Sequence, residues 1–125
     1  MGMTLKGGAP RQRSVSENIK DNKDDSMFKM TDGHFGTKNS NSNNVYVIER
    51  DNPIEAAKTF YDKIGYGGKF MEGGGENRVQ MLDGTIINFR ISSKSGSPAV
   101  DINVKYRNEK GKLKTHKLHF IKRSK

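Results

Sequence analysis

The chain has 125 residues, a formal net charge of +9 at pH 7 and no cysteine. This length suits one domain with one modest core, and the lack of cysteine excludes disulfides, thiolate zinc sites and cysteine nucleophiles. No run approaches the roughly 18 apolar residues of a membrane-spanning helix, so we expect no stable membrane association.

Basic residues are concentrated near the C-terminal end. Segment 105–125 holds nine basic residues and one acidic residue, Glu109. A stripe this basic favours a polyanionic partner, of which nucleic acid is the commonest. The alternative is an edge strand that is protected by solvated lysines.

The first third of the chain changes character near residue 28. Residues 1–27 are polar and almost without apolar periodicity, which predicts a flexible arm or linker ahead of a folded domain at 28–125. Segment 27–38 has enough Phe and Met to dock on a core. Residues 39–44 are expected to form a loop, and VYVIE at 45–49 a short strand.

A helix is predicted next, over 53–64. Asn52 can cap it, Pro53 suits its first position, and Glu55 lies three residues after the cap. Apolar residues recur at helical spacing as far as Gly65, which ends the pattern. Tyr61 belongs to this stripe, so we assign it to the core.

After a glycine-rich stretch at 66–78, the apolar pattern changes to period two. RVQML and TIINFRIS, joined by Asp-Gly, predict a hairpin, and PAVDINVKY and LKTHKLHFI predict two further strands. The fold class we predict is therefore α+β. It has an N-terminal helix or helices packed on one face of a four-stranded or larger antiparallel sheet.

Alternation along these strands predicts one face that the helix leaves uncovered. It would carry Asn88, Arg90, Asp101, Asn103, Lys105, Thr115, Lys117 and His119, with Arg78 and Gln80 from the first strand. The set combines a proton-transfer group with cations and amides. Antiparallel sheets commonly turn a polar side to water, however, so a histidine there can also be incidental.

The same alternation separates the histidines of THKLHF, residues 115–120. His116 has the parity of Leu118 and Phe120 and would lie at the rim of the core, whereas His119 would lie on the uncovered face. The H-x-x-H spacing is therefore not a metal pair, and no other metal ligands stand at convincing spacing. We expect no metal and no cofactor.

Several motifs, taken together in order, resemble those of the C-terminal toxin domains of LXG polymorphic toxins and related contact-dependent inhibition proteins. The matching pieces cover roughly residues 55–122 and are Ala56 to Ile64, Tyr66 to Lys69, Asp83 to Thr85, Phe89-Arg90, Ser92-Ser93, Gly96 to Pro98, and Leu118 to Phe120. Several such domains are ribonucleases. The resemblance implies the barnase–EndoU–colicin–RelE type of fold, with helices ahead of a four-stranded antiparallel sheet. It also points to His119 as the histidine of the last strand.

The function expected from this resemblance is metal-independent cleavage of RNA to 2′,3′-cyclic phosphate ends, with tRNA as the expected substrate. Such cleavage needs a base for the ribose 2′-OH, cations for the phosphate and an acid for the leaving oxygen. His119 is our candidate for the general acid or base, and Arg90 for the phosphate clamp. Lys69, which follows a glycine pair that would let the backbone approach a ligand, is a second phosphate contact or an alternative acid.

Other polar residues complete the candidate site, and each has a simpler explanation. Ser93, Ser97 and Thr115 could bond the phosphate or ribose, although both serines also suit a turn. Asp101 could orient His119 or Arg90, or be an ordinary strand carboxylate. His34 could be a second acid–base histidine or an incidental loop residue. The remaining candidates for substrate binding are Asn88, Asn103, Lys105, Lys114 and Lys117.

The rival functions are a metal-dependent DNase toxin, a non-catalytic nucleic-acid-binding domain and a structural adhesin tip. A toxin would be secreted or delivered from a cell surface and would act in the cytoplasm of a target bacterium. Its producer would carry a cognate immunity protein. We expect that partner to be acidic and to cover the face of Arg90 and His119.

Overall fold

A computed structural model describes residues 11–38, 44–73, 77–93, 96–105 and 113–123 of the chain. Within these ranges the chain forms two α-helices, one short 3₁₀ helix and nine strands. In order they are α1 (Val15–Asp21), η1 (Ser26–Phe28), β1 (Met30–Thr31), β2 (His34–Phe35), β3 (Thr37–Lys38), β4 (Val45–Arg50), α2 (Pro53–Ile64), β5 (Lys69–Phe70), β6 (Arg78–Gln80), β7 (Ile86–Arg90), β8 (Ala99–Asn103) and β9 (His116–Lys122).

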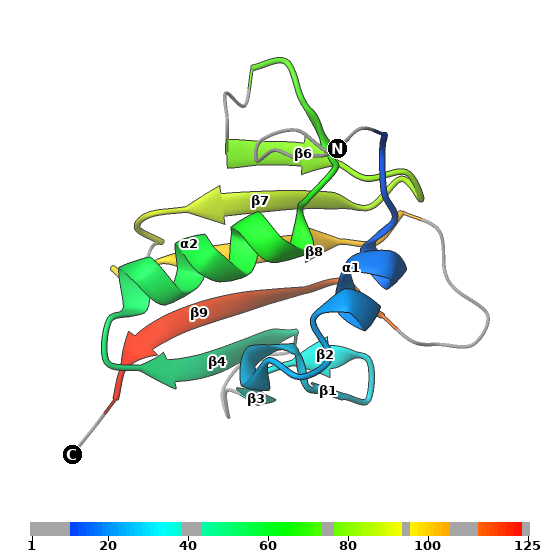
Figure 1. Ribbon diagram of the computed structural model, residues 1–125. Coiled ribbons are helices and arrows are strands. Elements are labelled where there is room, and N and C mark those ends of the chain that lie inside the picture. The colour runs from blue at the N-terminus through cyan, green and yellow to red at the C-terminus, as the bar shows by residue number, and fades with distance from the viewer. Residues whose placement is uncertain (1–10, 39–43, 74–76, 94–95, 106–112, 124–125) are drawn as a thin grey trace, which may run out of the picture.

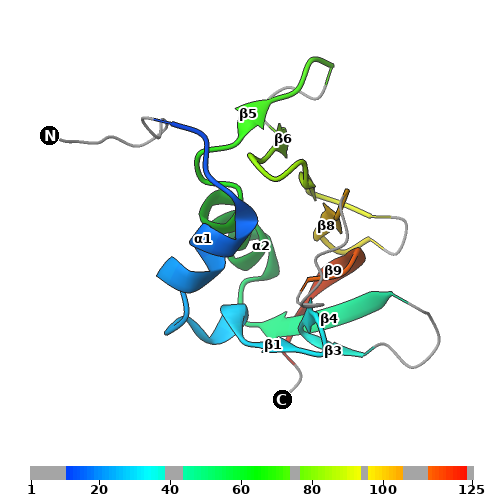
Figure 2. The same cartoon turned by 90° about the vertical axis from the view of Figure 1, so that its right-hand side faces the viewer.

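Seven of the strands form one sheet in the order β3-β4-β9-β8-β7-β6-β5, and β1 and β2 form a separate hairpin. All pairs in the large sheet are antiparallel except β4 with β9, which run parallel. Both α-helices lie on the same side of this sheet (Figures 1 and 2). The other face is covered by no described helix.

The predicted fold class is therefore wrong. The described chain is mostly sheet, with nine strands in two sheets and only two short helices, and its large sheet is mixed. Four of the strands are only two residues long, which is too short for a period of two to be recognised. The parallel pair escaped prediction because alternation within one strand carries no information on its neighbours.

The helix and the four main strands of the C-terminal half are confirmed. In α2 the Asn52 side chain accepts a hydrogen bond from the Glu55 N–H, Pro53 occupies the first turn, and Gly65 caps the end. The helix buries Ala57, Phe60, Tyr61 and Ile64 against the sheet, so Tyr61 belongs to the core as predicted. Strands β6 and β7 pair as a hairpin around Asp83 and Gly84, where Gly84 has a φ of +88°.

The core lies between α2 and the sheet and extends to the segment before β3. Phe28 and Phe35 pack on Phe60 with ring centroids 4.7 and 5.3 Å away. From the sheet it receives Ile87, Val100, Ile102, Leu118 and Phe120, all fully buried. The expectation that segment 27–38 docks on the core is confirmed. Neither described α-helix is long and apolar enough to span a membrane.

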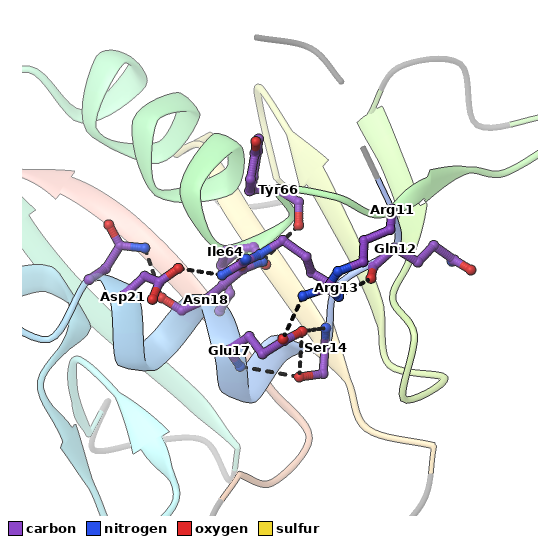
Figure 3. A network of polar contacts seen from close by, with 10 residues as sticks. Arg11, Gln12, Arg13, Ser14, Glu17, Asn18, Asp21, Ile64 and Tyr66 are labelled. Carbon is purple, nitrogen blue, oxygen red and sulfur yellow. Dashed lines mark hydrogen bonds and ion pairs between the residues drawn. The ribbon is translucent and has the colours of Figure 1, made fainter. Parts of the chain in front are cut away.

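Residues 11–21 form an N-terminal strap, which we define as the extended segment 11–14 together with α1 (Figure 3). Ser14 and Glu17 make a complete capping box at its turn into the helix. The buried Asn18 donates hydrogen bonds to the carbonyls of Ile64 and Tyr66 and accepts one from Arg13. The strap falls within the range predicted as a polar arm. The part of that range before residue 11 lies outside the described residues.

Candidate active site

The uncovered face of the sheet brings Arg90 and His119 to either side of Ala99. The register pairs Arg90 on β7 with Ala99 on β8, and Ala99 with His119 on β9. Residues directly opposite each other in a sheet project on the same side, so the two side chains flank the Ala99 methyl group. Neighbouring strands lie about 4.8 Å apart, which places the two backbone positions about 10 Å from each other.

Arg90 is held on this face by an ion pair with Asp101. Its Nε donates to Oδ2 of Asp101 at 3.0 Å and its Nη2 to Oδ1 at 2.9 Å. Asn88, directly opposite Asp101 in the register, donates to the same carboxylate at 3.3 Å. The guanidinium is therefore fixed along one edge and still carries donors elsewhere on its fork.

His119 lies against the turn that joins β7 to β8. Its Nδ1 is 3.2 Å from the Ser97 hydroxyl and 3.5 Å from that of Ser93, and the two hydroxyls are 3.4 Å apart. The Ser93 N–H donates to the Ser97 carbonyl, and Gly96, within this turn, has a φ of +92°. The serines therefore close the turn, as their simpler explanation predicted, and they also contact the imidazole, which the sequence did not predict.

The surroundings of His119 favour its neutral form. Partial burial lowers the pKa of the imidazole, the nearby Arg90 and Lys117 charges lower it further, and Asp101 raises it. The net direction is downward from the ordinary value of 6.5. At neutral pH the ring is therefore available to accept a proton.

Two of the predicted substrate-binding residues lie in the neighbouring rows of this face. Lys117 is exposed and lies directly opposite Asp101 in the register. Asn103 is exposed at the end of β8, two residues beyond Asp101. Lys105 is exposed beyond that strand. Residues 106–112 of the basic segment 105–125 lie outside the described residues.

Lys69 lies far from Arg90 and His119. Its strand β5 is the far edge of the sheet, four inter-strand steps, or about 19 Å, from β9. Across the strands Lys69 aligns with Gln80 and Ile86, four residues before Arg90 on β7. The preceding glycines have a packing role: a Cβ at Gly67 would lie 2.9 Å from the Arg13 side chain, and one at Gly68 would lie 2.7 Å from Val79. They let the chain pass between the strap and β6, which removes the reason for placing a ligand there.

Thr115 and Lys114 make local contacts at the other end of β9. The Thr115 hydroxyl accepts a hydrogen bond from the Val104 N–H at 2.9 Å. Lys114 lies over the Tyr46 ring at 5.5 Å, on the side of the core. Neither is brought beside His119. Arg78 and Gln80 of β6 share the face of Asn88 and Ile86, which they oppose in the register.

His116 and His34 belong to the opposite side of the sheet. His116 is buried, accepts the Phe35 N–H at Nε2 and contacts the Lys114 carbonyl through Nδ1 at 2.7 Å. His34 stacks on Tyr46 with ring centroids 3.6 Å apart. Both are structural, and neither reaches His119. Among the described residues, no three His, Asp or Glu side chains gather closely enough to hold a metal ion.

The residue that sequence reasoning overlooked is Ala99. It is fully buried although it lies on the uncovered face, because longer neighbours flank it. Its parity with Asp101 could have placed it on that face, but only the cross-strand register shows that it separates Arg90 from His119.

Comparisons of the chain with family models, with curated proteins and with solved structures found no match.

Proposed function

We propose that this chain is the ribonuclease domain of an antibacterial polymorphic toxin, cleaving RNA without a metal ion. One observation carries the proposal: Arg90 and His119 flank Ala99 on the uncovered face, and the Ser93–Ser97 turn contacts the imidazole. A guanidinium and a neutral imidazole on either side of one small residue supply two of the three groups that this cleavage needs, the cation and the base. The family resemblance points to the same two residues.

In the proposed reaction, His119 takes the proton of a ribose 2′-OH. The 2′-oxygen attacks the adjacent phosphorus, the bond from phosphorus to the 5′-oxygen breaks, and a 2′,3′-cyclic phosphate forms. Arg90 binds the phosphate oxygens as negative charge accumulates on them. The leaving 5′-oxygen takes its proton from water in this scheme, and Ser97 orients the imidazole through Nδ1.

The charge of the chain supports an RNA substrate. A net charge of +9 attracts the phosphate backbone over long distances, and Lys117 adds a cation beside the proposed site. We expect tRNA to be the substrate. The toxin would be delivered from a bacterial surface into the target cytoplasm, and an acidic immunity protein would cover the face of Arg90 and His119.

The decisive experiment incubates the purified chain with tRNA in excess EDTA. We expect cleavage with 2′,3′-cyclic phosphate ends, and a fall in rate of about 10²- to 10⁴-fold for His119→Ala. Arg90→Lys should also be impaired, because an ammonium cannot replace the bidentate fork. Lys58→Ala, which removes an exposed cation of α2 behind the sheet, is the control and should cleave normally.

Substrates without a 2′-OH separate the rival functions. Single-stranded DNA and 2′-O-methyl RNA should bind and remain intact, because the nucleophile is absent. Cleavage of DNA that EDTA abolishes would establish the metal-dependent rival. Binding of tRNA without cleavage under any condition would establish a non-catalytic domain.

A further inference from the structure

Asp101 holds the guanidinium of Arg90 by two hydrogen bonds. The carboxylate bonds two N–H groups of one guanidinium through both of its oxygens. Arginine loses much rotamer freedom when it is held in this way. A phosphate that binds a fixed guanidinium does not have to order it, which improves binding by pre-organisation.

Asp101 is itself anchored. The Asn88 amide donates to Oδ2, the same oxygen that accepts from the Nε of Arg90. The side chain of Asp101 is only 15% exposed and that of Arg90 is 31% exposed. The three residues therefore form a hydrogen-bonded row between β7 and β8 that is partly shielded from solvent.

We propose that Asp101 is a positioning residue: it holds one edge of the Arg90 guanidinium, so that the remaining N–H groups face the space above Ala99 where a substrate phosphate binds. This inference rests on the proposed function, because it takes a phosphate as the ligand. Asp101 acts through Arg90 and does not touch the phosphate.

Charge alone predicts the opposite effect of Asp101 on phosphate binding. A carboxylate this close to a bound phosphate repels it, so removing the charge would strengthen phosphate binding if Asp101 were an ordinary strand residue. Positioning and repulsion therefore predict changes of opposite sign. Lys117, opposite Asp101 in the register, is a cation of the same face that offsets part of this repulsion.

The test uses the whole chain and two readouts. The first is the dissociation constant of inorganic phosphate, from the shift of the His119 ring signals in NMR. The second is kcat/KM for a short RNA. For Asp101→Asn we expect phosphate binding to weaken about threefold or more, and kcat/KM to fall roughly 10- to 100-fold. Asp51→Asn, which breaks the exposed pair with Arg123, is the matched control and should change neither.

A double-mutant cycle tests whether Asp101 affects kcat/KM through Arg90. In an Arg90→Ala background, Asp101→Asn should change kcat/KM less than about twofold, because a residue that acts only through Arg90 has nothing left to position. An equal loss in both backgrounds overturns the inference, and so does tighter phosphate binding by Asp101→Asn.

A replacement variant and a readout that does not depend on RNA cleavage keep the test decisive. If Asp101→Asn does not fold, Asn88→Ala takes its place: an approximately threefold loss of phosphate affinity supports the positioning role, and unchanged or tighter binding overturns it. If the wild-type chain cleaves no RNA, the proposed function fails on its own. The phosphate measurements then continue to decide the role of Asp101.

Discussion

His116 and His119 are three residues apart on β9, yet their rings lie in opposite environments. His119 faces the uncovered side of the sheet beside Arg90. His116 is enclosed between the sheet and the β1–β2 hairpin, with His34, Tyr46 and Lys114 as neighbours. Alternation in a strand is sufficient to give two identical side chains a chemical role and a structural role.

The stability of the protein should depend on pH through His116. Burial lowers the pKa of this imidazole from 6.5 to about 4, because the charged ring would lose its hydration, and the nearby His34 and Lys114 lower it further. Protonation would also remove the acceptor for the Phe35 N–H. The unfolded chain binds the proton more readily, so this contribution to stability is present above pH 6.5 and is lost as the pH falls toward 4. The full loss would be roughly 3 kcal/mol.

The measurement is urea denaturation at pH 7.5 and 4.5. His116→Gln removes the titrating group and should show a smaller difference in unfolding free energy between the two pH values than the wild type, by about 2 kcal/mol. His119→Gln is the control. Its ring is only partly buried, so it should keep most of the wild-type dependence. Equal dependence in wild type and His116→Gln would contradict the assignment.

At the scale of elements, the strap explains features that look functional in the sequence. Gly67 and Gly68 are needed because Arg13 and β6 leave no room for a Cβ, and Arg13 also lies over the Tyr66 ring at 5.5 Å. Asn18 supplies donors to the Ile64 and Tyr66 carbonyls, at and just beyond the end of α2. The YGGK motif is therefore a packing feature between two elements.

Asn18→Ala should test this arrangement. The substitution leaves two carbonyls and the Arg13 donor without their partner (Figure 3), at a buried position. We expect a loss of about 2–3 kcal/mol in unfolding free energy, measured by urea denaturation. Gln12→Ala removes an exposed amide that bonds the Gln80 carbonyl, and it should cost less than about 1 kcal/mol. Similar values for both would show that the strap is only loosely attached.

The sequence predicted correctly those elements in which apolar residues recur at a helical or a strand spacing. The helix 53–64 and strands β6 to β9 follow from spacing and turn residues, and so does the side of the sheet on which Arg90 and His119 lie. The helix α1 had a readable signal, the S-V-S-E capping box at 14–17, but it has too few apolar residues to show a stripe. The separation of Lys69 from β9 depends on strand order, which no single strand encodes.

At the scale of the whole molecule, the sheet separates a side that is packed against the helices from the uncovered face, which is the open side of the protein. Both helices lie on one side of the sheet (Figure 2). The core and His116, which is opposite the buried Ile102 in the register, lie on that side too. The other carries Arg90, Lys117 and His119. Strand β4 pairs with β9 in parallel, although α2 and strands β5 to β8 separate them in the chain. Charge on the open side should therefore matter more for RNA than the same charge behind it.

Two charge reversals with the same net charge test this division. Lys117→Glu changes the open face, and Lys58→Glu changes the exposed surface of α2. We expect Lys117→Glu to weaken tRNA binding about tenfold and to reduce the slope of log affinity against log salt by about 0.7 or more. Lys58→Glu should weaken binding less than about threefold, through the smaller long-range attraction alone.

The affinities are measured by fluorescence anisotropy at several salt concentrations in a His119→Ala background, so that the RNA stays intact. Because both variants lower the net charge by the same amount, long-range attraction cancels in their ratio, and the remaining difference reports where RNA lies. Equal losses would mean that RNA does not bind the open face, and the site built around Arg90 would then have no substrate in reach. A larger loss for Lys58→Glu would move the interface to the helical side.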